Sequence, residues 1–260
     1  MKKSNRQTRM LLALVFGAIL SLFSAPVLHA SEALVAQANK AYNEGLYAEA
    51  AKLYEQVAAT GYESPELYYN TGNARFKLND FPGAILWYER ARRLDPGNED
   101  ILFNLNVANS KIADKIEPVP EMFYRRWYFT LVDRLSADGW AWASVSCFLA
   151  AFAMAVLYLL ASRMFLRKAG FWSAGVFLVL FLFTLVFSFS AYDKAYNTEE
   201  AIIFTPTVTV KSSPDEKSID LFVLHEGTKV RIMDRIGEWY EVRIANGSVG
   251  WLLSSTMERI

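Results

Sequence analysis

Two apolar stretches decide the fold: GWAWASVSCFLAAFAMAVLYLLA (139–161) and FWSAGVFLVLFLFTLVFSFSA (171–191). Neither contains a charged residue. A helix that crosses the hydrocarbon core of a bilayer, roughly 30 Å thick, needs about 20 consecutive apolar residues. A buried helical hairpin of a soluble protein is the alternative, but soluble helices normally carry a polar face, which these stretches lack. The sequence therefore predicts two transmembrane helices.

The segment between the two stretches indicates their orientation. Residues 162–170 include Arg163, Arg167 and Lys168 and no acidic residue. Short loops rich in Lys and Arg stay on the cytoplasmic side of a membrane. Arg125 and Arg126, which precede the first stretch, favour the opposite orientation. We expect residues 162–170 to form a cytoplasmic loop, which places the segments on both sides of the hairpin outside the cytoplasm.

Small residues recur at every fourth position of the first stretch. They are Gly139, Ala143, Cys147, Ala151 and Ala155. Small side chains at this spacing allow a second helix to approach closely. Two hypotheses follow: the stripe packs against the second stretch, or it docks a transmembrane helix of a partner.

Residues 1–30 have the composition of a secretory signal peptide. Basic residues come first, an apolar run follows over residues 11–23, and small residues precede a cleavage point after Ala30. An uncleaved anchor is the alternative, and it gives the same topology. Either reading exports the segment that follows.

Composition excludes several classes of protein. The chain has 260 residues, 53% of them hydrophobic, and a formal net charge of zero, which argues against disorder and against a basic nucleic-acid-binding protein. Its one cysteine, Cys147, lies in a predicted span, so no intrachain disulfide or thiolate metal cluster is expected. We find no glycine-rich phosphate loop and no nucleophile motif, and His225 has no second histidine or cysteine nearby. We expect a protein that is not an enzyme and that uses no metal or cofactor.

Residues 31–117 contain an internal repeat. Five pairs of like residues stand at one constant offset: Asn39 with Asn73, Tyr42 with Phe76, Tyr47 with Phe81, Ala50 with Ala84, and Tyr54 with Tyr88. In the second unit, Gly72, Ala84, Tyr88, Ala91 and Pro96 stand at the spacing of a tetratricopeptide repeat, which this segment resembles. The resemblance implies two helices per repeat, with turns at Gly45-Leu46 and Asn79-Asp80. A third amphipathic helix, ending near Lys115, is expected to cap the array.

The repeat resemblance also implies a partner-binding surface. In this family the first helix of each repeat lines a concave face that holds an extended peptide. The matching positions are Asn39, Tyr42, Asn43, Tyr69, Asn73, Phe76 and Lys77. A side-chain amide both donates and accepts, so Asn39 and Asn73 can clamp a peptide backbone, and neither is expected in the core. The alternative is that these asparagines cap local turns or face water.

Residues 118–138 form the approach to the membrane. Pro118 and Pro120 break the chain, and the following segment places Phe123, Trp127, Leu131 and Leu135 on one helical face. Aromatic residues and arginines at this density beside a span predict a helix that lies in the membrane interface. A helix that binds a partner protein is the rival hypothesis.

Residues 197–260 change from helical to alternating periodicity, which predicts a small all-β barrel. The segment LHEGTKVRIMDRIGEWYEVRIANGSVGWL (224–252) resembles a bacterial SH3-type domain. This resemblance implies binding of peptides or cell-wall material through an aromatic cleft, for which Trp239, Tyr240 and Trp251 are the matching residues. The alternative is that the tryptophans pack in the core or at its rim.

The complete order is signal peptide, tetratricopeptide repeats, interfacial helix, transmembrane hairpin and SH3-type barrel. This order resembles the BatE-like proteins of the Bacteroides aerotolerance (Bat) family. The resemblance implies an accessory protein that works with von Willebrand A-type membrane partners and a MoxR-type ATPase in envelope or oxidative-stress tolerance. We therefore expect a membrane-anchored scaffold in a bacterial inner membrane, with both soluble domains in the periplasm. The alternative is a protein that binds or senses peptidoglycan through the barrel.

Overall fold

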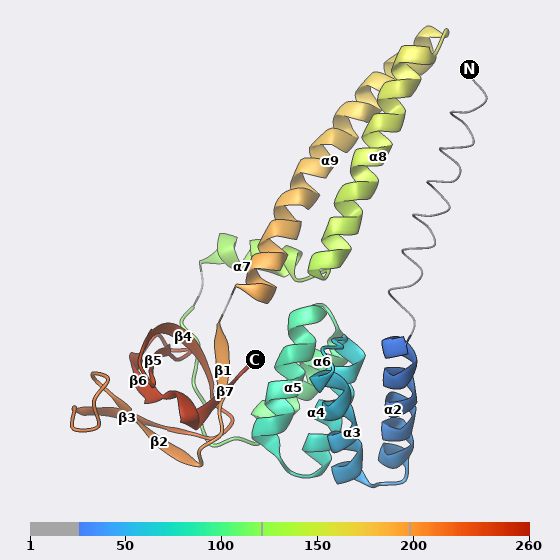
Figure 1. Ribbon diagram of the computed structural model, residues 1–260. Coiled ribbons are helices and arrows are strands. Elements are labelled where there is room, and N and C mark those ends of the chain that lie inside the picture. Colours follow the sequence, from blue (N-terminus) through green and yellow to red (C-terminus); the bar gives the residue numbers. More distant parts are fainter. Residues whose placement is uncertain (1–25, 121, 198) are drawn as a thin grey trace, which may run out of the picture. The chain divides into compact units, whose positions relative to one another are not determined.

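The computed structural model describes residues 26–120, 122–197 and 199–260, and side chains from residue 32 onward (Figure 1). It divides into two units, Met1–Glu63 and Ser64–Ile260, each of which is described by itself. Residues 1–25, which hold most of the predicted signal peptide, lie outside the described residues. The first described helix, α2 (Pro26–Asn43), continues through the predicted cleavage point after Ala30.

The first unit is a helix–turn–helix. α2 is joined to α3 (Tyr47–Ala59) by a short turn in which Gly45 adopts a φ of 80°, a conformation that glycine takes without steric cost. Ala38 and Ala50 are fully buried. These small side chains let the two helices approach closely, as the repeat pattern predicts.

The second unit begins with three helices, α4 (Pro65–Lys77), α5 (Phe81–Leu94) and α6 (Glu99–Asn109). The Ser64 hydroxyl caps α4 by accepting from the Leu67 amide, and the Asn98 side chain caps α6 by accepting from the amides of Asp100 and Ile101. The spacing between Ser64 and Asn98 is the same as that between Asn39 and Asn73. The predicted capping helix therefore starts where a third repeat would start.

Gly72 of α4 shows why the repeat pattern has glycine at this position. A Cβ atom on Gly72 would lie 2.6 Å from the ring of Tyr88 on α5, a separation that real Cβ contacts do not reach. The missing side chain lets the tyrosine ring pack directly on the α4 backbone. Tyr88 is consequently buried, with 1% of its surface exposed.

The capping helix ends earlier than predicted. The sequence predicts a helix to near Lys115, but α6 stops at Asn109. The following segment packs on the barrel instead: Ile116 contacts the barrel core, and the Val119 amide donates to the Ala245 carbonyl at 3.1 Å. Contact with the barrel takes the place of the last helical turns.

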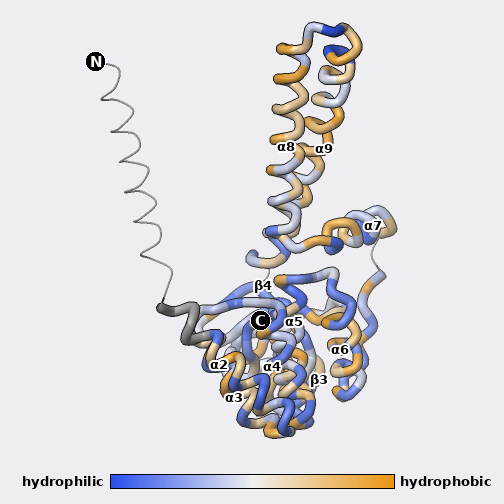
Figure 2. The backbone as a smooth tube through the Cα atoms, turned by 90° about the vertical axis from the view of Figure 1, so that its right-hand side faces the viewer, coloured by the Kyte–Doolittle hydropathy of each residue, from blue (hydrophilic) through white to orange (hydrophobic). Residues whose placement is uncertain are grey.

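Two long apolar helices follow the short helix α7 (Phe123–Val132). They are α8 (Ala137–Leu160) and α9 (Met164–Tyr196), and both are long and apolar enough to cross a membrane. Only 11% and 6% of their apolar windows are buried, whereas a core helix of a soluble protein would be mostly buried. Figure 2 shows the hydrophobic colouring along both helices. The predicted transmembrane hairpin fits this pair, which contains nearly all of residues 139–161 and 171–191.

The predicted loop over residues 162–170 is wrong in its extent. Only residues 161–163 connect the helices, and α9 already includes Arg167 and Lys168. The charged residues correctly mark the edge of the apolar stretch. They do not end the helix, however, because Leu, Arg and Lys are good helix formers. Gly170 continues the helix where α9 lies close to α8: an added Cβ would be 2.9 Å from the Met154 carbonyl oxygen.

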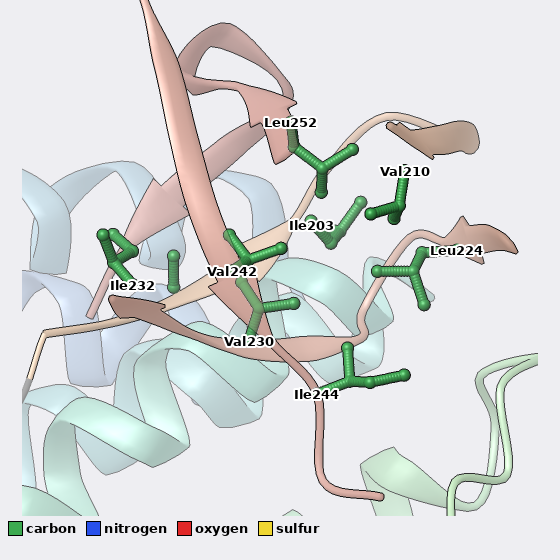
Figure 3. Close-up of a cluster of buried hydrophobic side chains, with 9 residues drawn as sticks. Ile203, Val210, Leu224, Val230, Ile232, Val242, Ile244 and Leu252 are labelled. Atoms are coloured by element: carbon green, nitrogen blue, oxygen red, sulfur yellow. The ribbon is translucent and has the colours of Figure 1, made fainter. Parts of the chain in front are cut away.

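The C-terminal part is a seven-stranded antiparallel sheet of strand order β3-β2-β6-β5-β4-β1-β7. Its strands are β1 (Glu200–Ile203), β2 (Thr207–Lys211), β3 (Asp220–His225), β4 (Lys229–Ile236), β5 (Trp239–Arg243), β6 (Val249–Leu253) and β7 (Met257–Arg259), with a short 3-10 helix, η1 (Ser254–Thr256), before β7. Alternate residues such as Val230, Val242 and Leu252 face a common core (Figure 3). The predicted fold class is confirmed: a helical repeat region, two apolar helices and an SH3-like sheet.

The barrel is packed against the second repeat. Ile202 of β1 is fully buried in one cluster with Ile85 and Leu86 of α5 and Leu105 of α6. Gly227, in the turn before β4, lies so close to Ile112 that an added Cβ would collide with the methyl carbon of that side chain. The repeat, which precedes the hairpin, and the barrel, which follows it, therefore share a hydrophobic core.

Candidate partner-binding surfaces

The helix residues predicted to line a peptide groove make the same internal contacts in both repeats. In the first unit, the Tyr54 hydroxyl donates to Asn39 Oδ1 at 2.6 Å, and the rings of Tyr42 and Tyr47 meet edge to face at 5.3 Å. At the equivalent positions of the second unit, Tyr88 donates to Asn73 Oδ1 at 2.7 Å, and the ring of Phe76 meets that of Phe81 at 5.5 Å. The two units therefore share equivalent side-chain contacts as well as equivalent residue types.

Asn73 also accepts a hydrogen bond from the next helix. The Asn104 side-chain amide of α6 donates to Asn73 Oδ1 at 3.1 Å and to the Tyr69 hydroxyl at 2.8 Å. The Tyr69 ring lies beside Tyr88, with centroids 5.9 Å apart. The polar groups of Tyr69 and Asn73 therefore join α4 to α5 and α6.

These bonds alter the predicted role of the two asparagines. The amide oxygens of Asn39 and Asn73, which the sequence predicts to clamp a peptide, accept tyrosine hydroxyls instead. Because each oxygen is already engaged inside the repeat, the amide nitrogens are left to donate to a peptide carbonyl. Of the other predicted positions, Asn43 and Lys77 are exposed on the helix surface.

The hydroxyl of Tyr54 is held in its protonated form. Burial, followed by the nearby Tyr42, raises the pKa of Tyr54 from 10.0 to about 12. A phenol with this pKa remains a donor throughout the physiological range. The hydrogen bond to Asn39 therefore keeps its donor at physiological pH.

The three predicted aromatic residues of the barrel do not form one cleft. In the register of β5 and β6, Trp239 pairs with Leu253 and Glu241 pairs with Trp251, which places both tryptophans on one face. Tyr240 pairs with Leu252, which is fully buried, so Tyr240 points to the opposite face. Neighbouring residues of a strand alternate between faces, so Tyr240 cannot line the same cleft as the two tryptophans, and the role of the three residues in binding stays a prediction.

Tyr240 has a structural environment of its own. Its ring packs against the barrel core, and its hydroxyl accepts a hydrogen bond from Arg259 at 3.1 Å. The Arg259 guanidinium also lies 5.2 Å from the ring centroid. Trp239 and Trp251, both half-buried, remain as the aromatic pair available on the outer face.

A buried ion network joins the second repeat to the barrel, and sequence analysis missed it. Glu89 of α5 is 6% exposed and lies 2.6 Å from Arg92 and 3.0 Å from Lys229 of β4. Lys229 also contacts Glu200 of β1 at 2.5 Å. Burial by itself would raise the pKa of Glu89, but the charges of Lys229 and Arg92 outweigh burial and hold that pKa below its ordinary value.

Asp114 forms a second polar link to the barrel. Its carboxylate accepts from the His225 amide at 2.8 Å and from the Thr228 hydroxyl at 2.6 Å, and it lies 2.7 Å from His225 Nδ1. Burial opposes ionisation, but these hydrogen bonds outweigh it and lower the pKa of Asp114. His225 is therefore a structural residue at the interface. The two residues are 111 positions apart in the chain, so only the fold could reveal the pair.

Two arginines of α5 reach the last strand of the barrel. Arg90 donates to the Arg259 carbonyl at 2.7 Å and pairs with Glu258 at 3.1 Å. Arg93 donates to the Ile260 carbonyl at 2.6 Å. These contacts add to the shared core of the two modules and fix the barrel on the repeat.

α7 lies against the end of the hairpin with one face and exposes the other. The Tyr128 hydroxyl and Ser190 Oγ of α9 are 2.5 Å apart, and Asp133 pairs with Lys194 at 2.6 Å. Phe123 and Trp127 are 84% and 68% exposed. These two belong to the apolar face that is predicted to lie in the membrane interface, and their exposure is what that prediction requires.

The small-residue stripe of α8 lies on the less exposed side of that helix. Ala151 is buried, while Phe148 and Phe152 beside the stripe are exposed. Aromatic rings of α8 and α9 meet along the pair, including Phe148 with Phe181 at 5.4 Å and Trp140 with Phe187 at 4.9 Å. The stripe accordingly packs the hairpin together, which favours the first of the two hypotheses.

Comparison with known proteins supports two modules. A family model described as a tetratricopeptide repeat matches residues 35–99, and one described as a bacterial SH3 domain matches residues 206–258. No curated protein matches the chain. The chain therefore contains one segment similar to tetratricopeptide repeats and one similar to bacterial SH3 domains. Within the described residues, no three His, Cys, Asp or Glu side chains are grouped to hold a metal ion.

Proposed function

We propose that the protein is a non-enzymatic scaffold that assembles protein partners at a bacterial inner membrane. The observation that carries this proposal is the shared core of the second repeat and the barrel, formed by Ile85 and Ile202. The second repeat and the barrel, both of kinds that commonly bind other proteins, are thereby packed together beside two apolar helices. The absence of catalytic motifs from the sequence supports a role in binding rather than chemistry.

The same contact supports a topology. Residues before the hairpin touch residues after it, as in the bond between Glu89 and Lys229, so both must lie on one side of the membrane. Two crossings by α8 and α9 meet this condition. We propose that this side is the periplasm, because Arg163, Arg167 and Lys168 stand at the opposite end of the hairpin and favour the cytoplasm.

We propose that partners contact the exposed first-helix residues of each repeat, Asn43 and Lys77. The test is site-specific photocrosslinking in cells, with a photoreactive amino acid at either position of the full chain. Lys52, exposed on α3, is the matched control because it lies on the second helix of its repeat. Crosslinked proteins from positions 43 and 77, and none from 52, are expected. Equal crosslinking from all three positions would contradict the proposal.

The resemblance in domain order supports a more specific proposal, a role in a Bat-type system of envelope or oxidative-stress tolerance. In this proposal the partners are membrane proteins with von Willebrand A-type domains, acting with a MoxR-type ATPase. Mass spectrometry of the crosslinked products from positions 43 and 77 tests it directly. Recovery of a von Willebrand A-type protein is expected, and reproducible recovery of unrelated proteins would reject the Bat assignment while leaving the scaffold intact.

A second candidate function is binding of peptidoglycan through the barrel. The observations that favour it are the bacterial SH3 match and the placement of Trp239 and Trp251 on one outer face. Sedimentation of the full chain with purified peptidoglycan tests this function. Loss of binding in Trp239→Ala, Trp251→Ala with retention in Leu221→Ala, an exposed apolar control on β3, would support it. Equal sedimentation of all three proteins would exclude this face as the binding surface.

A further inference from the structure

A cavity of about 490 Å³ lies where α7, α9 and the barrel meet. It is lined by Arg125, Arg126 and Phe129 of α7, Ser190 and Lys194 of α9, and Arg231 of β4, among others. We refer to it as the α7 cavity. Its volume falls within the range of about 300–1,000 Å³ that is typical of small-molecule sites.

The charge of the α7 cavity is positive. Four basic residues line it, and the two acidic residues are Asp133 and Asp193. Asp133 is bound by Lys194 through both carboxylate oxygens at 2.6 Å. Asp193 accepts from the Asn197 side chain at 2.8 Å. The charge of Asp133 is thus balanced by Lys194, whereas Asp193 keeps its negative charge because the Asn197 amide is neutral.

Two arginines of the α7 cavity have no such engagement. Among the residues that the structure describes, Arg126 forms no ion pair, and Arg125 only lies over the ring of Phe129, 5.6 Å from its centroid. Both are exposed on consecutive positions of α7. The pair therefore presents two guanidinium groups toward a cavity in which Asp193 is the one carboxylate without a basic partner among the described residues, so positive charge is still in excess.

In a bilayer crossed by α8 and α9, the α7 cavity would lie at the depth of the lipid headgroups. Ser190 stands at the end of the predicted apolar span and Lys194 one helical turn beyond it, so the cavity begins where hydrocarbon ends. On the same helix as the two arginines, Phe123 and Trp127 expose large apolar side chains, which suit the interface. Figure 2 shows α7 beside the end of the apolar hairpin.

We propose that the α7 cavity binds the headgroup of an anionic phospholipid, with its phosphate held by Arg125 and Arg126. Guanidinium groups donate paired hydrogen bonds to phosphate oxygens, and they are less strongly hydrated than ammonium groups. Thr130 and Ser190 also line the cavity, but their hydroxyls are engaged within the protein, with the Arg126 carbonyl and the Tyr128 hydroxyl, so the two arginines carry the recognition. A zwitterionic lipid lacks the net negative charge that the excess of basic residues in the cavity selects.

Native mass spectrometry of the full chain in detergent tests this site. Phosphatidylglycerol or phosphatidylcholine is titrated into the protein, and the bound lipid is counted. A basic residue near an anionic lipid contributes about 1 kcal/mol, so Arg125→Gln, Arg126→Gln should weaken phosphatidylglycerol binding roughly 30-fold. Arg126→Gln alone should weaken it about fivefold. Arg125→Lys, Arg126→Lys should retain most of the affinity because it retains the charge.

The matched control is Arg163→Gln, Arg167→Gln, which removes two arginines from the other end of the hairpin. We expect this variant to bind phosphatidylglycerol at the α7 cavity like the unmodified protein. An equal loss in both double variants would show that charge near the membrane acts without a site and would overturn the proposal. Unchanged binding in Arg126→Gln and in the Arg125/Arg126 double variant, each folded by circular dichroism, would overturn it as well.

A soluble phosphate ester could bind the two arginines in the same way as a lipid headgroup, so a second experiment distinguishes them. Glycerol 1-phosphate is added at millimolar concentration to the complex of the full chain with phosphatidylglycerol. Retention of the lipid is expected, because an acyl chain beside Phe129 adds apolar contact that a soluble ester lacks. Full displacement of the lipid by the soluble ester would reject a lipid site.

Discussion

At the scale of single residues, the tyrosine–asparagine bonds explain why the repeat is preserved in detail. Asn39 and Tyr54 are 15 residues apart, as are Asn73 and Tyr88, and each pair joins the two helices of one repeat. A hydroxyl buried without its acceptor loses the water that it would otherwise bind. The asparagines are therefore structural parts of the repeat before they are parts of any binding surface.

We predict that Asn73→Ala destabilises the helical repeat, because Tyr88 is 1% exposed and loses the acceptor at 2.7 Å. The expected loss in the free energy of unfolding is about 1–3 kcal/mol. Thermal unfolding followed by circular dichroism measures it. Asn43→Ala, at an exposed position, is the control and should leave the transition unchanged. A stable Asn73→Ala protein with weakened partner binding would instead restore the peptide-clamp hypothesis.

The two interface carboxylates predict a dependence of stability on pH. The folded protein lowers the pKa of Glu89 and of Asp114 from ordinary values of 4.5 and 3.8. A lowered pKa stabilises the folded state above the unfolded value, and this stabilisation is lost as the pH falls through the folded value. We expect the melting temperature to be constant near neutral pH and to fall below about pH 4.5. Thermal scans between pH 7 and pH 3 check this.

Asp114→Asn provides the test of that assignment. The amide oxygen can still accept a hydrogen bond but no longer titrates, so the variant should be less stable at pH 7 and should lose less stability on acidification than the unmodified protein. The neighbouring carboxylate Glu117, which is exposed, gives the control variant Glu117→Gln. Identical acid profiles for the Asp114→Asn and unmodified proteins would show that Asp114 does not contribute to the pH dependence.

At the scale of elements, the hairpin depends on how closely α8 approaches α9. The contact is tight at Gly170, where an added Cβ would meet the α8 backbone at 2.9 Å, and Ala151 is buried on the facing side. Membrane helices lack a strong hydrophobic drive to associate, so this fit is what holds them together. The stripe of small residues thereby determines the packing of the hairpin.

We predict that Ala151→Leu weakens the hairpin by about 1–3 kcal/mol, the usual cost of added volume at a packed position. Ala153→Leu makes the same chemical change two residues away, at an exposed position of α8, and should have no effect. Thermal stability of the full chain in detergent is the measurement. Equal melting temperatures for both variants would remove the stripe from the packing of the hairpin.

The elements also show what a sequence can predict and what it cannot. The spans, the repeat helices and the strands follow from local periodicity, which is why the contacts of Tyr54 and Tyr88 appear at equivalent positions of the two repeats. Ile202, Glu89 and Asp114 look like ordinary strand and surface residues, and their roles arise only when segments far apart in the chain meet, as at separations of 140 and 111 residues. Tyr240 is grouped with Trp239 in the sequence because they are adjacent, but alternation in β5 separates them.

At the scale of the whole molecule, the second repeat and the barrel sit at the same end of the hairpin in one unit. We predict that reporter fusions after Lys115 and at Ile260 report the same side of the membrane. Under the proposed orientation both report export, as alkaline phosphatase activity with little cytoplasmic reporter activity. A fusion at Arg163 is the control and should report the cytoplasm. Opposite results for the Lys115 and Ile260 fusions would contradict the two-span topology.

The contact between Glu89 and Lys229 also sets an order of synthesis, because 140 residues separate the two partners along the chain. At a translation rate of about 5–20 residues per second, β4 is synthesised on the order of ten seconds after α5. During that interval both apolar helices must enter the bilayer while the α5 face that will receive the barrel stays uncovered. We expect the charged residues Glu89, Arg90 and Arg92 to bind water on this uncovered face until the barrel forms. The charges that later join the two modules would then also limit premature association through Ile85 and Leu86 of the same helix.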